Sequence, residues 1–206
     1  MFSNTKRRNH DYVTLKIFAR DYGETCRDEF QTYEAVSKAN PSHPGHRHVR
    51  TALDTFPIDR PGGEHQCLVQ RPMWDSWKDL LLRNPSRRFS DVLLKGGLQH
   101  LLLALDYLHS ECKLVHTDIK ADNILHAIVD QGILEAFAKE EMATPSPRKH
   151  VEGAGPVYMS RRFGLPKDWG RIVLSDFGCA VRGDVKRNHD AQPNVYRSPE
   201  VMIEAP

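Results

Sequence analysis

His116-Thr117-Asp118-Ile119-Lys120-Ala121-Asp122-Asn123 is the stretch from which the rest of this 206-residue chain can be interpreted. Short apolar runs precede it at Leu114-Val115 and follow it at Ile124-Leu125. A polar loop clamped between two short strands holds its side chains at a rigid edge of a fold, where catalytic groups tend to lie. The pattern therefore predicts a functional loop at residues 116–123.

The side chains of this loop, together with one motif downstream, have the chemistry of a phosphate site. Asp118 is a candidate base, Lys120 is a cation two residues later, and Asn123 offers a neutral oxygen. Asp176-Phe177-Gly178 follows a strand that we expect at 171–174. Two carboxylates, a lysine and an amide at strand ends are suited to binding magnesium and phosphate groups.

These motifs resemble those of a known family. Residues 116–123 resemble the catalytic loop of the eukaryotic protein kinases, usually H-R-D-x-K-x-x-N, and residues 176–178 resemble their D-F-G motif. The letters H-T-D-I-K look like the SR-protein-specific serine/threonine kinases, especially the fungal ones. Residues 40–45 and 158–166 resemble the fungal members as well.

The resemblance implies an α+β fold, namely the two-lobed protein-kinase-like fold in incomplete form. No glycine lies among the eleven residues before Tyr12, so we expect the small lobe to lack the glycine-rich hairpin. We also expect the large lobe to lack the helices that follow the activation segment, which ends at Ser198-Pro199-Glu200. The expected organisation is a disordered start at 1–10, a partial small lobe at 11–70, a hinge at 71–73, and a partial large lobe at 74–206 with an insert at about 127–170.

The first predicted strand, 12–18, alternates in character. Val13, Leu15 and Ile17 would face one side, and Thr14 and Lys16 the other. Val13-Thr14-Leu15-Lys16 resembles the kinase V-A-I-K motif, which makes Lys16 the lysine that binds the α- and β-phosphates of ATP.

A helix is predicted at 25–38, where Phe30, Tyr33 and Val36 recur at helical spacing. Alignment with the kinase pattern favours Glu29 as the ion-pair partner of Lys16. Glu34 remains the alternative.

The next segments are predicted to be a loop at 39–50 and strands at 49–56 and 66–69. We interpret the loop's His43, His46 and His48 as exposed residues rather than metal ligands. At the hinge, the resemblance assigns the carbonyl of Arg71 and the N–H of Met73 to recognition of adenine.

Helices are predicted at 74–83 and 90–111, the second with Ser90 as a candidate N-cap. Close packing would explain Gly96-Gly97 in its interior. Two short strands joined by a turn, which would be enough to connect Asn123 to Asp176, need only about 12 residues. About 40 of the residues between Asn123 and Asp176 are therefore expected to form an insert.

Within the insert, a helix is predicted at 131–142. Thr144-Pro145-Ser146-Pro147 follows it and is interpreted as a plain linker, with regulatory phosphorylation of its Ser/Thr-Pro pairs as the alternative.

The function implied by the resemblance is ATP-dependent phosphorylation of serine or threonine. Asp118 would accept the hydroxyl proton, Lys120 would neutralise charge on the phosphoryl group, and Asn123 and Asp176 would bind Mg²⁺. By resemblance, the substrates are Arg-Ser-rich splicing factors, and the location is the cytoplasm and nucleus. The alternatives are a non-catalytic pseudokinase-like binding module, a gene fragment, and, less favoured, a small-molecule phosphotransferase.

Thr117 departs from the kinase pattern. Most kinases have an arginine at this position, and that arginine pairs with a phosphorylated activation segment. Because threonine cannot form such a charge pair, we expect the activation segment of this chain to order without phosphate.

Composition argues against several other classes of protein. The net charge of +2 gives no basic field on the scale needed for direct nucleic-acid binding. No stretch approaches the ~20 apolar residues of a membrane span. The four cysteines form no C-x-x-C pair, so we expect reduced thiols rather than a zinc site; they are Cys26, Cys67, Cys112 and Cys179.

Overall fold

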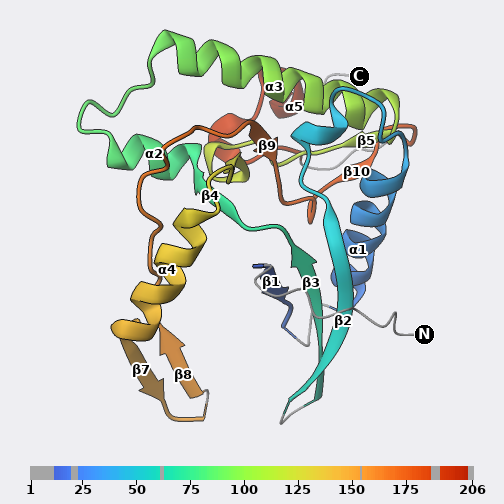
Figure 1. The fold of residues 1–206 in the computed structure, drawn as a ribbon. Coiled ribbons are helices and arrows are strands. Elements are labelled where there is room, and N and C mark those ends of the chain that lie inside the picture. The colour runs from blue at the N-terminus through green and yellow to red at the C-terminus, as the bar shows by residue number, and fades with distance from the viewer. Residues whose placement is uncertain (1–11, 20–22, 61–62, 154, 187–190, 204–206) are drawn as a thin grey trace.

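The structure is a computed structural model that describes residues 12–19, 23–60, 63–153, 155–186 and 191–203, without the side chains of 23–27. A small antiparallel sheet with one helix against it forms the first part of the chain. A second part, richer in helix, lies beyond one end of this sheet (Figure 1). The mixed content confirms the predicted α+β class. The disordered start predicted at 1–10 lies outside the described residues.

The small sheet has the strand order β1-β3-β2 and consists of β1 (Thr14–Ile17), β2 (Ala52–Arg60) and β3 (Gly63–Gln70). β2 and β3 extend further than predicted, because their pairing continues until Arg60 lies opposite Gly63. The side chains around β1 alternate as predicted. Lys16 is partly buried, whereas Leu15 and Ile17 are exposed on the opposite face.

α1 (Gly23–Lys38) packs against this sheet and begins two residues before the predicted start. Its apolar residues recur every three or four positions and therefore share one face. Tyr33 and Val36 on this face are buried, and Phe30 is partly buried. The predicted helix is confirmed, and the buried residues show which side of α1 faces the sheet.

The loop between α1 and β2 contains the short helix η2 (His46–His48) and corrects one prediction. We predicted that His43, His46 and His48 are exposed, but His43 and His46 are partly buried and His48 is only 1% exposed. Its ring stacks on that of His100, with 4.3 Å between centroids, and its Nδ1 lies 3.0 Å from the carbonyl oxygen of Ile172. Turn-forming residues indicate a loop, but they do not indicate which side chains the loop buries.

Residues 73–76 form a strand and not the first turn of the helix predicted at 74–83. β4 (Met73–Ser76) pairs with β6 (Ile124–Ala127), and α2 (Trp77–Arg83) begins only after it. Ser76 is the N-cap of α2, since its Oγ accepts a hydrogen bond from the backbone N–H of Asp79 at 3.1 Å. This cap explains the later start of the helix.

α3 (Asp91–Ser110) confirms the long helix predicted at 90–111. Ser90 caps it as predicted, with its Oγ accepting from the N–H of Leu93 at 3.3 Å. Gly97 is required by packing, because a Cβ at this position would collide with the ring of Trp77. A Cβ on Gly96 would meet open space, so close packing explains only one of the two glycines.

Two short sheets frame the loop at 116–123. The first pairs β5 (Leu114–Val115) with β10 (Val181–Arg182), and the second has the order β4-β6-β9, with β9 at Ile172–Leu174. The loop ends in the single turn η3 (Ala121–Asn123). After β10 the chain forms two further short helices, η4 (Asn194–Tyr196) and α5 (Pro199–Met202).

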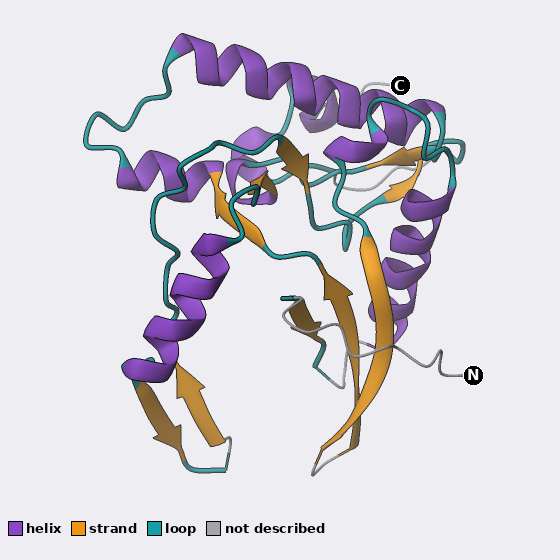
Figure 2. Cartoon of the chain, in the orientation of Figure 1, coloured by secondary structure: helices purple, strands orange, loops and turns teal. Residues whose placement is uncertain are grey.

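The insert between β6 and β9 contains α4 (Gly132–Ala143), which confirms the helix predicted at 131–142. It also contains a hairpin that was not predicted, β7 (Arg148–Val151) with β8 (Gly155–Tyr158). Every residue of both strands is exposed, so the alternating pattern of a half-buried strand is absent. α4 and the hairpin project away from the short sheets, on the same side of the molecule as the β2–β3 hairpin (Figure 2).

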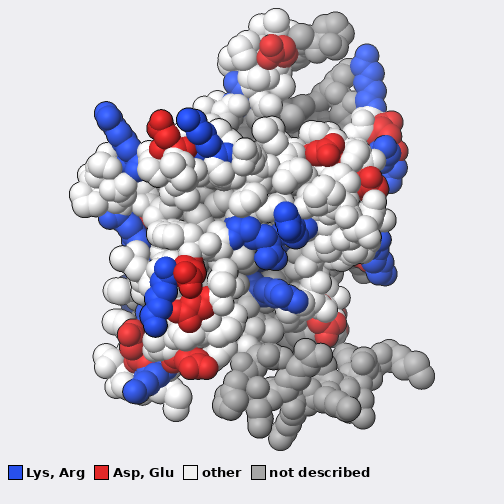
Figure 3. All heavy atoms as spheres, turned by 45° about the horizontal axis from the view of Figure 1, so that its top comes forward, with Lys and Arg blue, Asp and Glu red and all other residues white. Residues whose placement is uncertain are grey.

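Charged side chains of both signs are interspersed over the face seen in Figure 3, in agreement with the net charge of +2. In the part of the chain that the structure describes, no helix has both the length and the apolar character needed to cross a bilayer.

Lowering the pH is expected to destabilise the fold. Burial lowers the pKa of four histidines in the folded chain, namely His48, His100, His116 and His126. Unfolded chains protonate histidine near pH 6.5, so stability is lost as the pH falls below about 6.5 and levels off below the folded pKa values. Denaturant unfolding at about pH 7.5 and about pH 5.5 would measure the loss.

His126→Phe provides the matched variant for this measurement. The His126 ring is buried and lies between those of Trp74 and Trp169. We expect this variant to have a smaller pH dependence, whereas His150→Phe on the exposed strand β7 should behave like the parent chain. Equal stability of the parent at both pH values would contradict the prediction.

Candidate active site

Asp118 is held from two sides within the loop at 116–123. The Nζ of Lys120 lies 2.7 Å from Asp118 Oδ2. Asn123 Nδ2 donates to the same oxygen and to the Asp118 carbonyl oxygen, at 2.9 Å in each case. No described residue donates to Asp118 Oδ1, which is therefore available to a ligand. The hydrogen bond to Asp118 raises the pKa of Lys120, so this lysine remains charged at neutral pH.

Lys16 lies between two carboxylates. Its Nζ is 2.7 Å and 3.1 Å from the two carboxylate oxygens of Glu29, and 3.2 Å from Asp176 Oδ1. Glu34 instead forms an exposed ion pair with Lys38 within α1. Of the two candidate partners of Lys16, the structure thus brings Glu29 to it and not Glu34.

Burial and charge oppose each other at this ion pair. Burial alone would lower the pKa of Lys16, but the hydrogen bond to Glu29 and the charges of Asp176 and Glu29 raise it on balance. Burial raises the pKa of Glu29, and Lys16 opposes this rise. Since a buried carboxylate without a partner is costly, Lys16 stabilises the inward position of Glu29.

His116 connects the loop to the strand that precedes Asp176. Its Nε2 lies 3.1 Å from the carbonyl oxygen of Ser175, and its Nδ1 accepts from the N–H of Asp118 at 3.3 Å. Burial lowers the pKa of His116, which favours the neutral ring. A neutral ring with the proton on Nε2 satisfies both contacts.

Phe177 packs between α1 and the loop. Its side chain is 1% exposed, and its ring centroid lies 5.2 Å from that of Tyr33 and 5.2 Å from that of His116. Asp176 has a φ of 68°, so the chain turns sharply and directs Asp176 toward Lys16 while Phe177 enters the core.

Asn123 and Asp176 have the chemistry of ligands for a hard cation. Asn123 uses its Nδ2 for both bonds to Asp118, which leaves its Oδ1 for a ligand. The backbone N–H of Ser175 donates to the carbonyl of Asn123 at 2.9 Å, so the two candidate ligands lie at adjacent strand ends. In the described ranges, no group of three or more His, Cys, Asp or Glu is arranged so that it could hold a metal ion by itself. A site completed by phosphate oxygens and water suits Mg²⁺ rather than a metal enclosed by protein.

The segment predicted to be the hinge, residues 71–73, has a contact that the sequence did not predict. Arg50 Nη2 donates to the carbonyl oxygen of Arg71 at 3.0 Å, and Arg50 Nη1 lies 3.4 Å from Ser175 Oγ. The Arg71 carbonyl, proposed to bind adenine, thus retains one lone pair. Met73 begins β4 and is partly buried. Arg50 is far from Arg71 in the sequence, and no local pattern indicates their contact.

Thr117 ties the loop to the start of the activation segment. Its Oγ1 donates to the carbonyl oxygen of Cys179 at 2.6 Å, and its φ is 62°. The β5–β10 pairing and a bond from the N–H of Gly183 to the carbonyl of Lys113, at 2.8 Å, extend the same connection. Neutral hydrogen bonds therefore hold the start of the segment, and its ordering without phosphate stays a prediction.

Curated proteins with similar sequences are protein kinases, although no protein-family model matches the chain. The sequence is 40% identical over 199 residues to a serine/threonine protein kinase of Aspergillus fumigatus, covering 94% of this chain and 46% of that protein. It is 34% identical over 144 residues to protein kinase dsk1 of Schizosaccharomyces pombe, covering 69% and 26%. It is 29% identical over 163 residues to SRSF protein kinase 3 of Homo sapiens, covering 76% and 29%. The chain therefore spans less than half the length of each of these relatives.

Among solved structures, the chain resembles a crystallised kinase domain. The TM-score is 0.64 at 21% identity, and the match covers 95% of this chain and 51% of that one. This similarity confirms the predicted two-lobed fold in incomplete form.

Replacing Thr117 tests the hydrogen bond from its hydroxyl to the carbonyl oxygen of Cys179. Thr117→Val removes the hydroxyl, and we expect amide exchange at residues 177–182 to accelerate roughly threefold to tenfold, as one neutral hydrogen bond of about 0.5–1.5 kcal/mol is lost. Hydrogen exchange followed by mass spectrometry would measure this change. Thr117→Ser keeps the hydroxyl and should exchange like the parent. Equal exchange in the valine and serine variants would show that the hydrogen bond does not hold the segment.

Proposed function

The chain is a partial protein kinase domain related to serine/threonine kinases, and we propose that it transfers the γ-phosphoryl group of ATP to serine or threonine hydroxyls of proteins. The observation that carries the proposal is that two groups of charged side chains, one around Lys16 and one around Asp118, lie at adjacent strand ends. Lys16 is held by Glu29 and Asp176, and Asp118 is held by Lys120 and Asn123.

We assign to each side chain the role that the resemblance to kinases implies, and the contacts of the charged residues support this assignment. Asp118 Oδ1 accepts the proton of the substrate hydroxyl and orients its oxygen, because Oδ2 is already held. Lys120 carries positive charge next to the transferred group. Lys16 binds the α- and β-phosphates, with Glu29 fixing its position. The carbonyl of Arg71 and the N–H of Met73 bind the edge of the adenine base.

Mg²⁺ fits the oxygens available at this site. Asp176 and Asn123 would hold it, since both offer oxygen ligands at adjacent strand ends. When bound, the ion neutralises charge on the β- and γ-phosphates.

Arg-Ser-rich splicing factors are the proposed substrates. The support is the similarity to SRSF protein kinase 3 and dsk1. Lys120, two residues after the base, agrees with a serine or threonine hydroxyl as acceptor.

Two variants of the catalytic carboxylates test the proposal. Mg-ATP should raise the melting temperature of the parent chain, and the chain should phosphorylate an Arg-Ser peptide. Asp118→Asn should retain the thermal shift but lose at least ~100-fold in phosphoryl transfer, because the base is gone. Asp176→Ala should lose both the thermal shift with Mg-ATP and the phosphoryl transfer. Differential scanning fluorimetry and a radiolabel transfer assay would measure the two properties.

The outcomes separate two kinds of protein. A shift with Mg-ATP but no transfer by the parent chain would favour a non-catalytic nucleotide-binding module. Absence of any shift would contradict nucleotide binding itself.

Glu29→Gln tests the positioning of Lys16. We expect the KM for ATP to rise about tenfold, because a charged hydrogen bond becomes a neutral one. Glu34→Gln is the matched control on the same helix and should leave the KM unchanged, since Glu34 contacts Lys38 and not Lys16. A similar effect of both substitutions would indicate a general weakening of α1.

A further inference from the structure

Ser146 lies in the link between α4 and β7, which the sequence led us to interpret as a plain linker. In the structure its backbone N–H donates to Glu141 Oε1 at 2.7 Å, and its hydroxyl donates to Glu141 Oε2 at 2.6 Å. Ser146 is partly buried, whereas Thr144 is exposed. One carboxylate thus holds Ser146 at two atoms, a specific contact that a simple connection does not need.

Arg161 brings positive charge to this link from beyond β8. Its Nε lies 2.7 Å from Glu141 Oε2 and 3.5 Å from Ser146 Oγ, and its Nη1 lies 3.7 Å from Glu140 Oε2. Its Nη2 also donates to the carbonyl of Thr144. The last turn of α4 has two carboxylates and no basic residue, although cations are favoured at that end of a helix. Arg161 supplies the missing charge.

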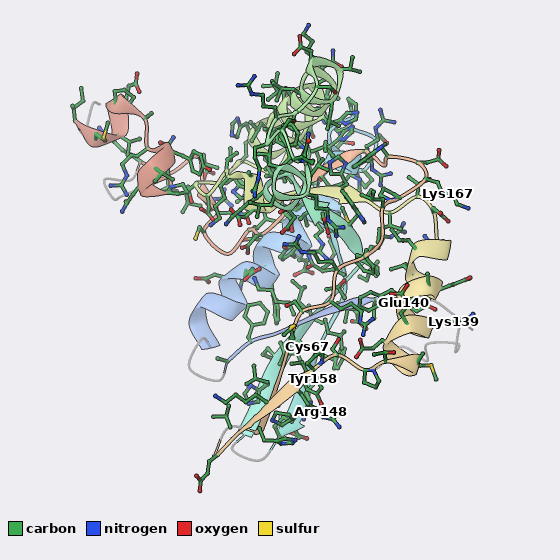
Figure 4. All side chains as sticks on the ribbon, turned by 90° about the vertical axis from the view of Figure 1, so that its left-hand side faces the viewer. Cys67, Lys139, Glu140, Arg148, Tyr158 and Lys167 are labelled. Atoms are coloured by element: carbon green, nitrogen blue, oxygen red, sulfur yellow. The ribbon has the colours of Figure 1, made fainter. Side chains whose placement is uncertain are left out.

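The residues after Ser146 have the features of a kinase substrate. Pro147 follows directly, and Arg148 and Lys149 come next on an exposed strand. Figure 4 shows Arg148 beside Tyr158 at the base of the hairpin, while Lys139 and Glu140 project to different sides of α4. Residues 145–147 have no regular secondary structure, so the stretch can enter a kinase in extended form.

We propose that Ser146 is a phosphorylation site for a proline-directed protein kinase and that Arg161 binds the phosphate. A phosphoserine carries a charge of about −1.5 to −2 and three strong acceptor oxygens. It would repel Glu141 and attract the guanidinium of Arg161, which already lies beside Ser146 Oγ. The phosphate therefore replaces Glu141 as the partner of Arg161, the N–H of Ser146 loses its acceptor, and the link between α4 and β7 loosens. The proposal does not depend on the activity of the chain itself.

The modification is a phosphoryl transfer from ATP bound to the modifying kinase. The bond between the γ-phosphorus and the β,γ-bridging oxygen breaks, and a bond between that phosphorus and Ser146 Oγ forms. The hydroxyl proton passes to the catalytic base of the modifying kinase, and ADP leaves.

The site is tested on the full chain carrying Asp118→Asn, so that any phosphate comes from the added enzyme. Incubation with a purified cyclin-dependent kinase and ATP, followed by mass spectrometry, should locate phosphate on Ser146. Glu141→Ala should accelerate this modification roughly tenfold, because Ser146 loses both of its hydrogen bonds.

Glu140→Ala is the matched control for the rate. Glu140 contacts Arg161 but not Ser146, so this variant should be modified at the parent rate. Phosphate on Thr144 alone, or no phosphate on Ser146 even in Glu141→Ala, would refute the site.

A second measurement tests the role of Arg161. The second pKa of the phosphate, followed by ³¹P NMR, should be higher in Arg161→Gln than in the parent. Arg162→Gln should titrate like the parent, because Arg162 Nη2 lies 3.7 Å from Asp79 Oδ1 and, among the described residues, Arg162 does not contact the link. Equal titration of the two variants would refute the assignment of Arg161. Phosphorylation should also accelerate exchange of the Ser146 amide, and unchanged exchange would refute the loosening.

Discussion

Phe177 is the residue on which the arrangement of the site depends. Its buried ring contacts Tyr33 of α1 on one side and His116 of the loop at 116–123 on the other. These three residues come from distant parts of the sequence, and the aromatic contacts hold them at fixed separations. Asp176 precedes Phe177 and turns back toward Lys16. Packing of one side chain thus positions the carboxylate beside it, because core positions tolerate little displacement.

Electrostatics then determine what this packed frame can bind. Glu29 is buried and requires a cation, and Lys16 requires a partner to remain positioned in front of Asp176. Asp118 has one oxygen held by Lys120 and Asn123 and the other available. Positive and negative groups are therefore paired, but each pair leaves atoms that face a ligand.

The outer part of the insert, the link at 144–147 and the hairpin β7–β8, is held by a different kind of interaction, whereas Ile133 and Leu134 of α4 are buried against Trp74 and Leu80. Its hairpin is exposed on both strands, and the link at 144–147 is held by Glu141 and Arg161 rather than by a hydrophobic core. Polar contacts near the surface contribute less to stability than core packing and respond to added charge. The link and the hairpin are therefore expected to open more readily than the packed part of the chain, since regions with few buried apolar contacts open most readily.

The sequence by itself determined the features that depend on neighbouring residues. The loop at 116–123, the helices at α1, α3 and α4, and the candidate chemistry of Asp118 and Asp176 all followed from residue type and spacing. Only the tertiary structure decided that His48 is buried, that Arg50 contacts Arg71, and that Thr117 bonds to Cys179. The hairpin β7–β8 and the contact of Ser146 with Arg161 likewise appear only in the structure. The contacts of His48, Arg50 and Thr117 join segments far apart in the sequence, so they depend on the path of the whole chain and not on local periodicity. The hairpin is local, but its strands are exposed on both faces and therefore lack the alternating pattern that would have predicted them.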